Sequence, residues 1–210
     1  MTAVAGGHTL YRTFGKPLLD RMLALVLLVL FSPIILIVAI AAFCVHGSPV
    51  LFRQLRPGLG EQPFELLKFR TMTSERKADG ELRSDAERFT SFGRWLRRTS
   101  LDELPQFVNV LRGELSLVGP RPLLPEYLPR YSAHQRRRHE VKPGMTGLAQ
   151  VSGRNALDWA TRLNLDVEYV DSCSLRLDFW IMTRTLLKVV TGEGIADGRG
   201  PTSEPFTGQR

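Results

Sequence analysis

The chain has 210 residues, of which 43% are hydrophobic, so it is long enough for one domain with a core of its own, or one domain with an appendage. Its formal net charge of +7 indicates anionic partners, such as nucleic acid, acidic lipid or phosphorylated metabolites. The two cysteines, the four histidines and the glycines show no disulfide framework, no zinc spacing, no P-loop and no dinucleotide-binding motif, which argues against these classes of site.

The N-terminal part predicts a membrane element. Residues 1–13 are expected to be flexible, and residues 22–45 carry no charged side chain. That run exceeds the roughly 20 residues that a helix needs to cross a bilayer. A signal peptide is the competing interpretation, but its apolar region usually has about 7–15 residues, and no A-x-A-like cleavage site closes this run.

Two features favour a re-entrant element over an ordinary span. Proline in the middle of the run, at Ser32-Pro33, removes a backbone hydrogen bond, and the Ser32 hydroxyl can bond the carbonyl that is freed. Basic residues lie on both flanks, and such residues favour the cytoplasmic side of a membrane. They are Arg12, Lys16 and Arg21 before the run and Arg53, Arg56, Lys68 and Arg70 after it. We therefore predict a re-entrant helix-break-helix over residues 14–46, although proline also kinks ordinary spans.

Residues 47–190 are predicted to form a cytoplasmic domain that begins with short elements. Residues 50–52 and 64–69 are typical of strands around a Pro-Gly turn. Residues 73–88 are polar, which favours a loop or a short surface helix. Residues 89–98 interleave aromatic and arginine side chains, a pattern that fits a helix at a membrane interface and equally a surface helix packed on its own core.

An adjacent pair of acids, Asp102 and Glu103, follows that basic segment. Ser100 and Glu103 match an S-x-x-E capping box, which predicts a helix that begins here and holds both carboxylates in its first turn. Pro105 strains this interpretation and can move the helix start by a few residues. Because acids are ordinary residues for a first turn, the pair alone does not separate a functional site from a capped helix.

The second half of the chain alternates rigid loops with helical segments. Two prolines hold Arg121 on an extended segment, which is a good way to aim a guanidinium at an anion. Residues 149–155 are predicted to form a short strand and a turn that carries Arg154. The pattern of residues 157–190 is mainly helical, and the glycine-rich residues 191–210 are expected to form a flexible tail.

Several short motifs recur along the chain in a defined order. Besides Ser32-Pro33, they are K-F-R-T-M at 68–72, S-L-D-E-L-P-Q at 100–106, N-V-L-R-G at 109–113, V-G-P-R-P at 118–122, P-G-M-T-G at 143–147, Q-V-S-G-R-N at 150–155 and D-V-E-Y-V at 166–170. Each motif is weak alone, whereas the series is specific. From about residue 14 to residue 195 the chain resembles the monotopic bacterial phosphoglycosyl transferases, or bacterial sugar transferases. It is expected to be their minimal form, because it lacks the multi-span N-terminal extension of larger members.

The resemblance implies a reaction and a fold. Family members transfer sugar-1-phosphate from a nucleoside diphosphate sugar, usually a UDP-sugar, to polyprenyl phosphate, which releases UMP and initiates polysaccharide or glycoconjugate synthesis. Mg²⁺ is the implied cofactor and anionic membrane lipid a further partner, with no nucleic acid. The implied location is monotopic, on the cytoplasmic face of the bacterial inner membrane. The expected fold is α/β (α+β): the re-entrant helix plus a small catalytic domain with interfacial amphipathic helices and a short sheet.

The resemblance also implies roles for individual residues. Asp102 matches the nucleophile that forms a covalent phosphosugar intermediate, and Glu103 matches an acid that helps to hold Mg²⁺. The matches to substrate-binding positions are Lys68, Arg97, Arg121, Arg154 and Asp178. These roles are chemically coherent, since a carboxylate can form a reactive acyl phosphate, and arginines and Mg²⁺ offset the charge of a diphosphate.

Two alternatives remain. A membrane-associated hydrolase or phosphotransferase that uses the same acids to activate water predicts nucleotide release without a lipid product. A non-catalytic membrane adaptor predicts that Asp102→Asn changes only local charge.

Overall fold

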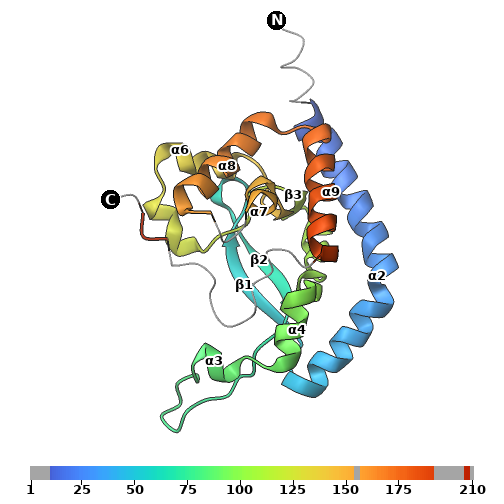
Figure 1. Cartoon of the computed structure of the whole chain (residues 1–210), viewed down its shortest axis with the longest axis vertical. Helices are drawn as coiled ribbons and strands as arrows, with labels where there is room; N and C mark the ends of the chain where they lie inside the picture. Colours follow the sequence, from blue (N-terminus) through green and yellow to red (C-terminus); the bar gives the residue numbers. More distant parts are fainter. Residues whose placement is uncertain (1–9, 154–156, 192–205, 209–210) are drawn as a thin grey trace, which may run out of the picture.

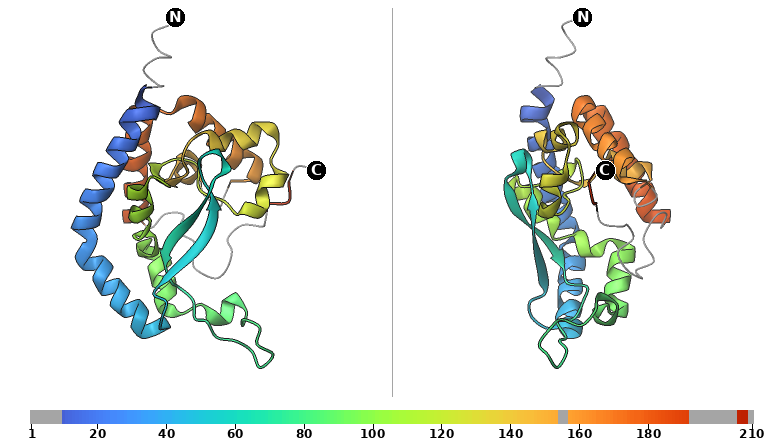
Figure 2. Two further views of the ribbon diagram at one scale, coloured as in Figure 1. Left: turned by 180° about the vertical axis from the view of Figure 1, so that it is seen from behind. Right: turned by 90° about the vertical axis from the view of Figure 1, so that its left-hand side faces the viewer.

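The computed structural model of the chain describes residues 10–153, 157–191 and 206–208 (Figure 1). Helices predominate among these residues, and two small sheets lie between them. This mixed architecture agrees with the predicted α/β (α+β) class. The long helix α2 (Lys16–His46) follows one side of the molecule, and the other elements gather along its inner face (Figures 1 and 2).

The apolar N-terminal run folds into one helix rather than two. A π-helical turn, η1 (Tyr11–Gly15), leads into α2, which stays helical through Pro33. The Ser32 hydroxyl donates to the carbonyl of Val29 at 2.8 Å, which is the carbonyl that Pro33 leaves without its usual donor. The predicted hydrogen bond is therefore confirmed, while a continuous, bowed helix stands in place of the predicted break (Figure 1). Re-entry into the membrane stays a prediction.

The two faces of α2 meet different surroundings. The inner face packs on the domain both before and after the proline, through Ala24, Val38 and Ala42, which are at most 3% exposed. The outer face leaves apolar side chains exposed, among them Leu25, Val29, Leu36, Ile40 and Phe43. Within the described residues, Tyr11–His46 is the one helical stretch long and apolar enough to cross a membrane, and an 18-residue window within it has a mean hydropathy of 3.2. Together these features support association with a membrane.

An antiparallel hairpin runs through the centre of the domain. Strand β1 (Leu51–Pro57) pairs with β2 (Pro63–Phe69), so that Leu51 lies opposite Phe69. The connection includes η2 (Leu59–Glu61), where Gly60 has a left-handed φ of 58° that favours glycine. Both predicted strands and their turn are confirmed, although β1 is longer than predicted. In a second sheet, β3 (Ser116–Val118) pairs in parallel with β4 (Gly144–Thr146).

Most of the remaining helices are short. They are α3 (Asp85–Arg88), α4 (Ser91–Thr99), η3 (Leu101–Glu103), α5 (Gln106–Arg112), η4 (Pro125–Arg130), α6 (Ala133–Arg136), η5 (Arg137–Glu140), α7 (Leu148–Ser152), α8 (Trp159–Ser172) and α9 (Leu175–Thr191). Helices α3, α4, α8 and α9 lie where the sequence pattern predicted helices or a short surface helix. Helix α7 replaces the strand predicted to begin at Ala149, because its apolar side chains are buried against α8 and α9 and packing overrides their β propensity.

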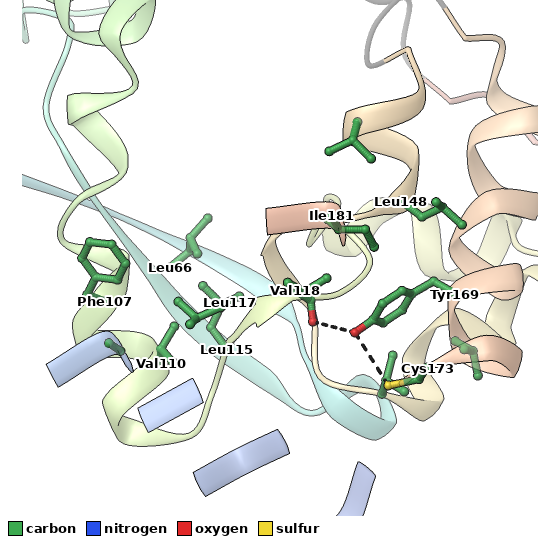
Figure 3. Close-up of a cluster of buried hydrophobic side chains, with 14 of the residues drawn as sticks. Leu66, Phe107, Val110, Leu115, Leu117, Val118, Leu148, Tyr169, Cys173 and Ile181 are labelled. Carbon is green, nitrogen blue, oxygen red and sulfur yellow. Dashed lines mark hydrogen bonds between the residues drawn. The ribbon is translucent and has the colours of Figure 1, made fainter. Parts of the chain in front are cut away.

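One hydrophobic core joins the segments that carry the candidate site. Figure 3 shows side chains of β2, α5, β3, α7, α8 and α9 packed together, among them Leu66, Phe107, Val110, Leu117, Leu148, Tyr169 and Ile181. The buried Tyr169 hydroxyl donates to Asp178 Oδ1 at 2.6 Å and lies 3.0 Å from the carbonyl of Val118. This contact ties α8 to β3 and to α9.

The end of the chain is anchored at one described residue. Phe206 is 3% exposed and packs among Tyr127, Tyr131 and Trp159, and Arg130 donates to its carbonyl. The prediction of a flexible tail over residues 191–210 therefore does not hold at Phe206. Similarly, residues 10–13, which lie in the segment predicted to be flexible, are helical.

Candidate active site

The two acids lie in a tight turn between α4 and α5. Ser100 adopts a left-handed conformation, with φ of 57°, and ends α4. Asp102 and Glu103 belong to the following 3-10 turn, η3, and α5 begins only after Pro105. The predicted capping box is therefore wrong, because Ser100 makes no side-chain cap and Glu103 turns to other partners. The shift of the helix start that Pro105 suggested is confirmed.

Cations from two distant segments meet these acids. Glu103 Oε1 accepts a hydrogen bond from Lys68 Nζ of β2 at 2.7 Å and from Arg121 Nη2, beyond β3, at 3.2 Å. The same lysine lies 4.0 Å from Asp102 Oδ2. Three of the predicted site segments, 68–72, 100–106 and 118–122, are thus brought together although they are far apart in sequence.

The two acids differ in their readiness to bind a proton. Asp102 is only 6% exposed, and burial raises its pKa to about 6 although Lys68 acts in the opposite direction. Burial also acts to raise the pKa of Glu103, but the charges of Lys68 and Arg121 outweigh it and lower that pKa to about 2. Glu103 is therefore a fixed anion, whereas Asp102 is an ionised but more basic carboxylate at neutral pH. Such a separation of two neighbouring pKa values is typical of a catalytic pair.

A cavity of about 1570 Å³ opens over this pair. The predicted residues Lys68, Arg97, Asp102, Glu103 and Arg121 all line it. Arg97 lies 4.6 Å from the centre of the Phe89 ring, and its Nε donates to Thr71 Oγ1 at 3.3 Å. The charged part of the cavity therefore offers several cations to an anionic ligand beside a buried carboxylate.

Two predicted site residues stand apart from this arrangement. Asp178 is not among the described residues that line the cavity. It is buried against η1 and α2, where the Tyr11 hydroxyl donates to it at 2.6 Å and Lys16 Nζ donates to it at 2.7 Å. Its position gives no support to a substrate-binding role. Arg154 lies outside the described residues.

Two further polar residues line the cavity, and sequence reasoning assigned neither of them a site role. Arg56 of β1 lines it, and burial lowers the pKa of this guanidinium to about 10, with nearby Arg121 acting in the same direction. Gln150 of α7 lines it as well. Its side-chain nitrogen and oxygen are buried and have no hydrogen-bond partner within the described part of the chain. The Q-V-S-G-R-N motif marks this glutamine, but no local pattern shows that its amide is left unsatisfied inside a cavity.

The far wall of the cavity is apolar. Helices α2 and α9 supply it, through Leu23, Leu27, Phe31, Met182, Leu186 and Val189. Both helices also carry exposed apolar side chains on their outer faces, including Phe179, Leu187 and Val190 of α9. The cavity therefore has a cation-rich end and, opposite it, an apolar wall. That wall is built from α2 and α9, the two helices with exposed apolar side chains on their outer faces.

Comparison with known proteins identifies the family. The family model described as bacterial sugar transferase matches residues 11–192. The chain belongs to the bacterial sugar transferase family. Membership makes this sugar transferase an enzyme, which argues against a non-catalytic adaptor. It also places Lys68, Asp102, Glu103 and Arg121 within the matched region.

Individual relatives cover this sugar transferase to different extents. It is 53% identical over 193 residues to the uncharacterized sugar transferase EpsL of Bacillus subtilis (strain 168), covering 92% of this chain and 96% of the relative. It is 41% identical over 188 residues to a UDP-glucose:undecaprenyl-phosphate glucose-1-phosphate transferase of Caulobacter vibrioides, covering 84% and 70%. It is 37% identical over 198 residues to the exopolysaccharide production protein ExoY of Rhizobium meliloti (strain 1021), covering 86% and 87%. The chain spans 39–41% of the length of several longer relatives.

Proposed function

We propose that this sugar transferase moves a sugar-1-phosphate from a nucleoside diphosphate sugar to polyprenyl phosphate, as the first step of a polysaccharide or glycoconjugate. The names of relatives such as the Caulobacter enzyme favour a UDP-sugar as donor and undecaprenyl phosphate as acceptor. The observation that carries the proposal is the buried, basic carboxylate of Asp102, set among Lys68, Arg97 and Arg121 in a cavity with an apolar wall.

The reaction has two steps at one phosphorus atom. An Asp102 carboxylate oxygen attacks the β-phosphorus of the donor and forms an acyl phosphate. The bond from that phosphorus to the bridging oxygen breaks, and UMP leaves with the oxygen and its electron pair. An oxygen of polyprenyl phosphate then attacks the same phosphorus and releases the Asp102 carboxylate. The products are UMP and a polyprenyl diphosphate sugar.

The cations of the site make the attack of one anion on another feasible. Lys68 lies between Asp102 and Glu103, and the Arg121 guanidinium reaches Glu103 from the cavity side of the turn. Arginine and lysine at these positions offset negative charge on the phosphoryl oxygens as it is redistributed in the transition state. Glu103, which stays ionised, keeps both cations in place before the donor binds.

The acids of the turn fit Mg²⁺ as a cofactor. No group of three or more acidic, histidine or cysteine side chains that could hold a metal occurs among the described residues. Mg²⁺ needs no such cage, because it commonly binds one or two carboxylates together with substrate phosphate. Glu103, with Asp102 beside it, would hold the ion, which when bound supplies positive charge to the diphosphate.

The apolar surfaces of α2 and α9 suit a lipid acceptor and a membrane location. The apolar wall of the cavity lies on the side of these helices, so a polyprenyl chain in the membrane can bring its phosphate to the cation-rich end. Helix α9 also carries Arg176, Arg184 and Lys188, which suit anionic lipid. We place the enzyme at the cytoplasmic face of the inner membrane, with α2 re-entrant. A tag at residue 1 that proved accessible only from the opposite face would contradict this topology.

The test is intact-protein mass spectrometry in a membrane mimic. The protein is incubated with Mg²⁺ and each of a panel of UDP-sugars, without lipid, beside Asp102→Asn. We expect a mass gain of one sugar phosphate with one donor, absent in the variant. Release of UMP together with free sugar phosphate, and no lipid-linked product after polyprenyl phosphate is added, would instead support a hydrolase. If no donor gives a mass gain or UMP release, with or without polyprenyl phosphate, the proposal is contradicted.

A further inference from the structure

The segment that presents Arg121 is held at three consecutive residues. The Gly119 N–H donates to the carbonyl of Thr146 at 2.8 Å, and the Gly144 N–H donates to the carbonyl of Pro120 at 3.0 Å. The third anchor is a side chain, since Arg138 Nη2 donates to the carbonyl of Arg121 itself at 2.6 Å. Two of these anchors extend the β3–β4 pairing, whereas the third comes from a different part of the fold.

Arg138 is fully engaged by the protein. It lies on η5 and is 2% exposed. Its Nε and Nη2 donate to Asp166 Oδ2 of α8 at 3.0 and 2.8 Å, and its Nη1 lies 3.5 Å from the Tyr131 hydroxyl. Each nitrogen of the guanidinium therefore has a protein partner. Arg138 and Asp166 both line the cavity, but the Arg138 guanidinium has little capacity left to bind a ligand. Its remaining contact is with the backbone carbonyl of Arg121.

A buried ion pair is a poor way to gain stability alone. Taking two charges out of water costs several kcal/mol per ion, and well-packed apolar residues often serve stability equally well. Burial raises the pKa of Asp166, and the charge of Arg138 acts against that rise. The pair does, however, fix a guanidinium in one place with a donor aimed at one carbonyl, which an apolar pair cannot do.

We propose that Arg138 and Asp166 are positioning residues, which hold the backbone of Arg121 so that its guanidinium lies over the Asp102–Glu103 turn. This inference rests on the proposed function, because it takes Arg121 to bind the diphosphate of the donor. Asp166 orients Arg138, Arg138 holds the Arg121 carbonyl, and Arg121 contacts Glu103 at the reacting centre.

A double-mutant cycle separates positioning from general stability. Asp166→Asn is made alone and in the Arg121→Ala background, and kcat/KM for the UDP-sugar and the Kd of UDP are measured in each protein, with thermal melting alongside. The matched control is Asp171→Asn. It removes an exposed ion pair, Arg137–Asp171, between the same two elements, η5 and α8, without touching Arg121.

We expect Asp166→Asn to lower kcat/KM about 10–100-fold when Arg121 is present, which is the usual range for a group that orients a functional residue. In the Arg121→Ala background the further loss should be under about threefold, since the effect passes through Arg121. UDP binding should show the same non-additivity, while the melting temperature should fall equally in both backgrounds. Asp171→Asn should stay within about twofold throughout.

Equal losses in both backgrounds, or no loss in a folded Asp166→Asn protein, would overturn the inference. If Asp166→Asn does not fold, Arg138→Lys takes its place, because lysine keeps the charge but lacks the fork that reaches both partners. If neither variant folds, the Arg138–Asp166 pair is needed for folding, and the inference that it positions Arg121 is overturned. A wild-type protein that binds UDP with the expected coupling but transfers no sugar phosphate would contradict the proposed function and leave this inference standing.

Discussion

Two clusters in this molecule have almost the same composition. In each, one lysine lies between two carboxylates, although Lys16 is buried and Lys68 is half-buried. Lys16 lies 3.6 Å from Asp20 and 2.7 Å from Asp178, where α2 meets α9. Lys68 lies 4.0 Å from Asp102 and 2.7 Å from Glu103 at the candidate active site.

The clusters differ in what satisfies the remaining oxygens. Around Lys16, hydroxyl groups complete the set: Tyr11 and Tyr169 donate to Asp178, and Ser116 donates to Asp20 at 2.6 Å. Around Lys68, no hydroxyl donor to Asp102 is found in the described part of the chain, and the carboxylate borders the cavity. Saturation by hydrogen bonds makes the first cluster structural, whereas its absence leaves Asp102 able to react.

The largest expected effect on the transfer reaction follows from replacing Asp102. Asp102→Asn should lower transfer more than about 10³-fold, because no other group replaces the nucleophile. The same change should stabilise the protein by about 1–3 kcal/mol at pH 7–8. The folded-state pKa of Asp102 is raised above its unfolded value, so the ionised acid costs stability above pH 6, and that cost vanishes as the pH falls towards 4. Transfer assays and melting curves from pH 4 to 8 measure both effects. A variant that melts lower than wild type at pH 8 would contradict this account.

The role of Lys68 is visible in the pH profile. Because Asp102 must be ionised to attack, kcat/KM should rise with pH up to about 6 and then level off. Lys68→Met removes the cation that lowers the pKa of Asp102, so the rising limb should move to higher pH and the plateau should fall about 10–100-fold. Lys77→Met, in an exposed pair with Glu81, is the matched control and should leave the profile unchanged. An unshifted limb in Lys68→Met would show that Asp102 does not set the profile.

In the cluster around Lys16, loss of an acid is expected to lower stability and to leave activity nearly unchanged. Asp178→Asn removes the carboxylate that pairs with Lys16, and breaking such a buried pair costs about 3–5 kcal/mol. Melting temperature should therefore fall by several degrees, while kcat/KM measured well below the transition should change less than about threefold. Denaturant titration and initial-rate assays of the same preparation measure the two quantities. A large loss of activity in a protein of unchanged stability would restore Asp178 to the substrate site.

The sequence predicted features that depend on local order. The β1–β2 hairpin follows from apolar segments around a Pro-Gly turn, and α4, α8 and α9 follow from helical periodicity. The association of Asp102 and Glu103 with Lys68, Arg97 and Arg121 came only from the family resemblance, since no spacing reveals that residues 34 positions apart will meet. The comparison with known proteins later supported that family.

The features that sequence reasoning missed depend on distant partners. Ser100 and Glu103 matched a capping box, but Ser100 turned left-handed and Glu103 found Lys68 and Arg121. Pro33 predicted a break, but contacts on both sides of it and the Ser32 hydroxyl keep α2 in one piece. Asp178 matched a family acid, and only the fold shows that Lys16, 162 positions away, neutralises it.

The smallest expected effect concerns the side-chain amide of Gln150 in the cavity. The buried amide of Gln150 offers one donor face and one acceptor, and neither has a partner among the described residues. A donor substrate that pairs with it should bind more weakly to Gln150→Leu, and a lost hydrogen bond of about 1–1.5 kcal/mol corresponds to a rise in KM of roughly tenfold with kcat little changed. The free protein should be no less stable, because leucine fills the same space without an unsatisfied amide. Val151→Leu, on the same helix but outside the cavity lining, controls for repacking. An unchanged KM for both the sugar nucleotide and the lipid would show that the Gln150 amide meets only water and takes no part in substrate binding.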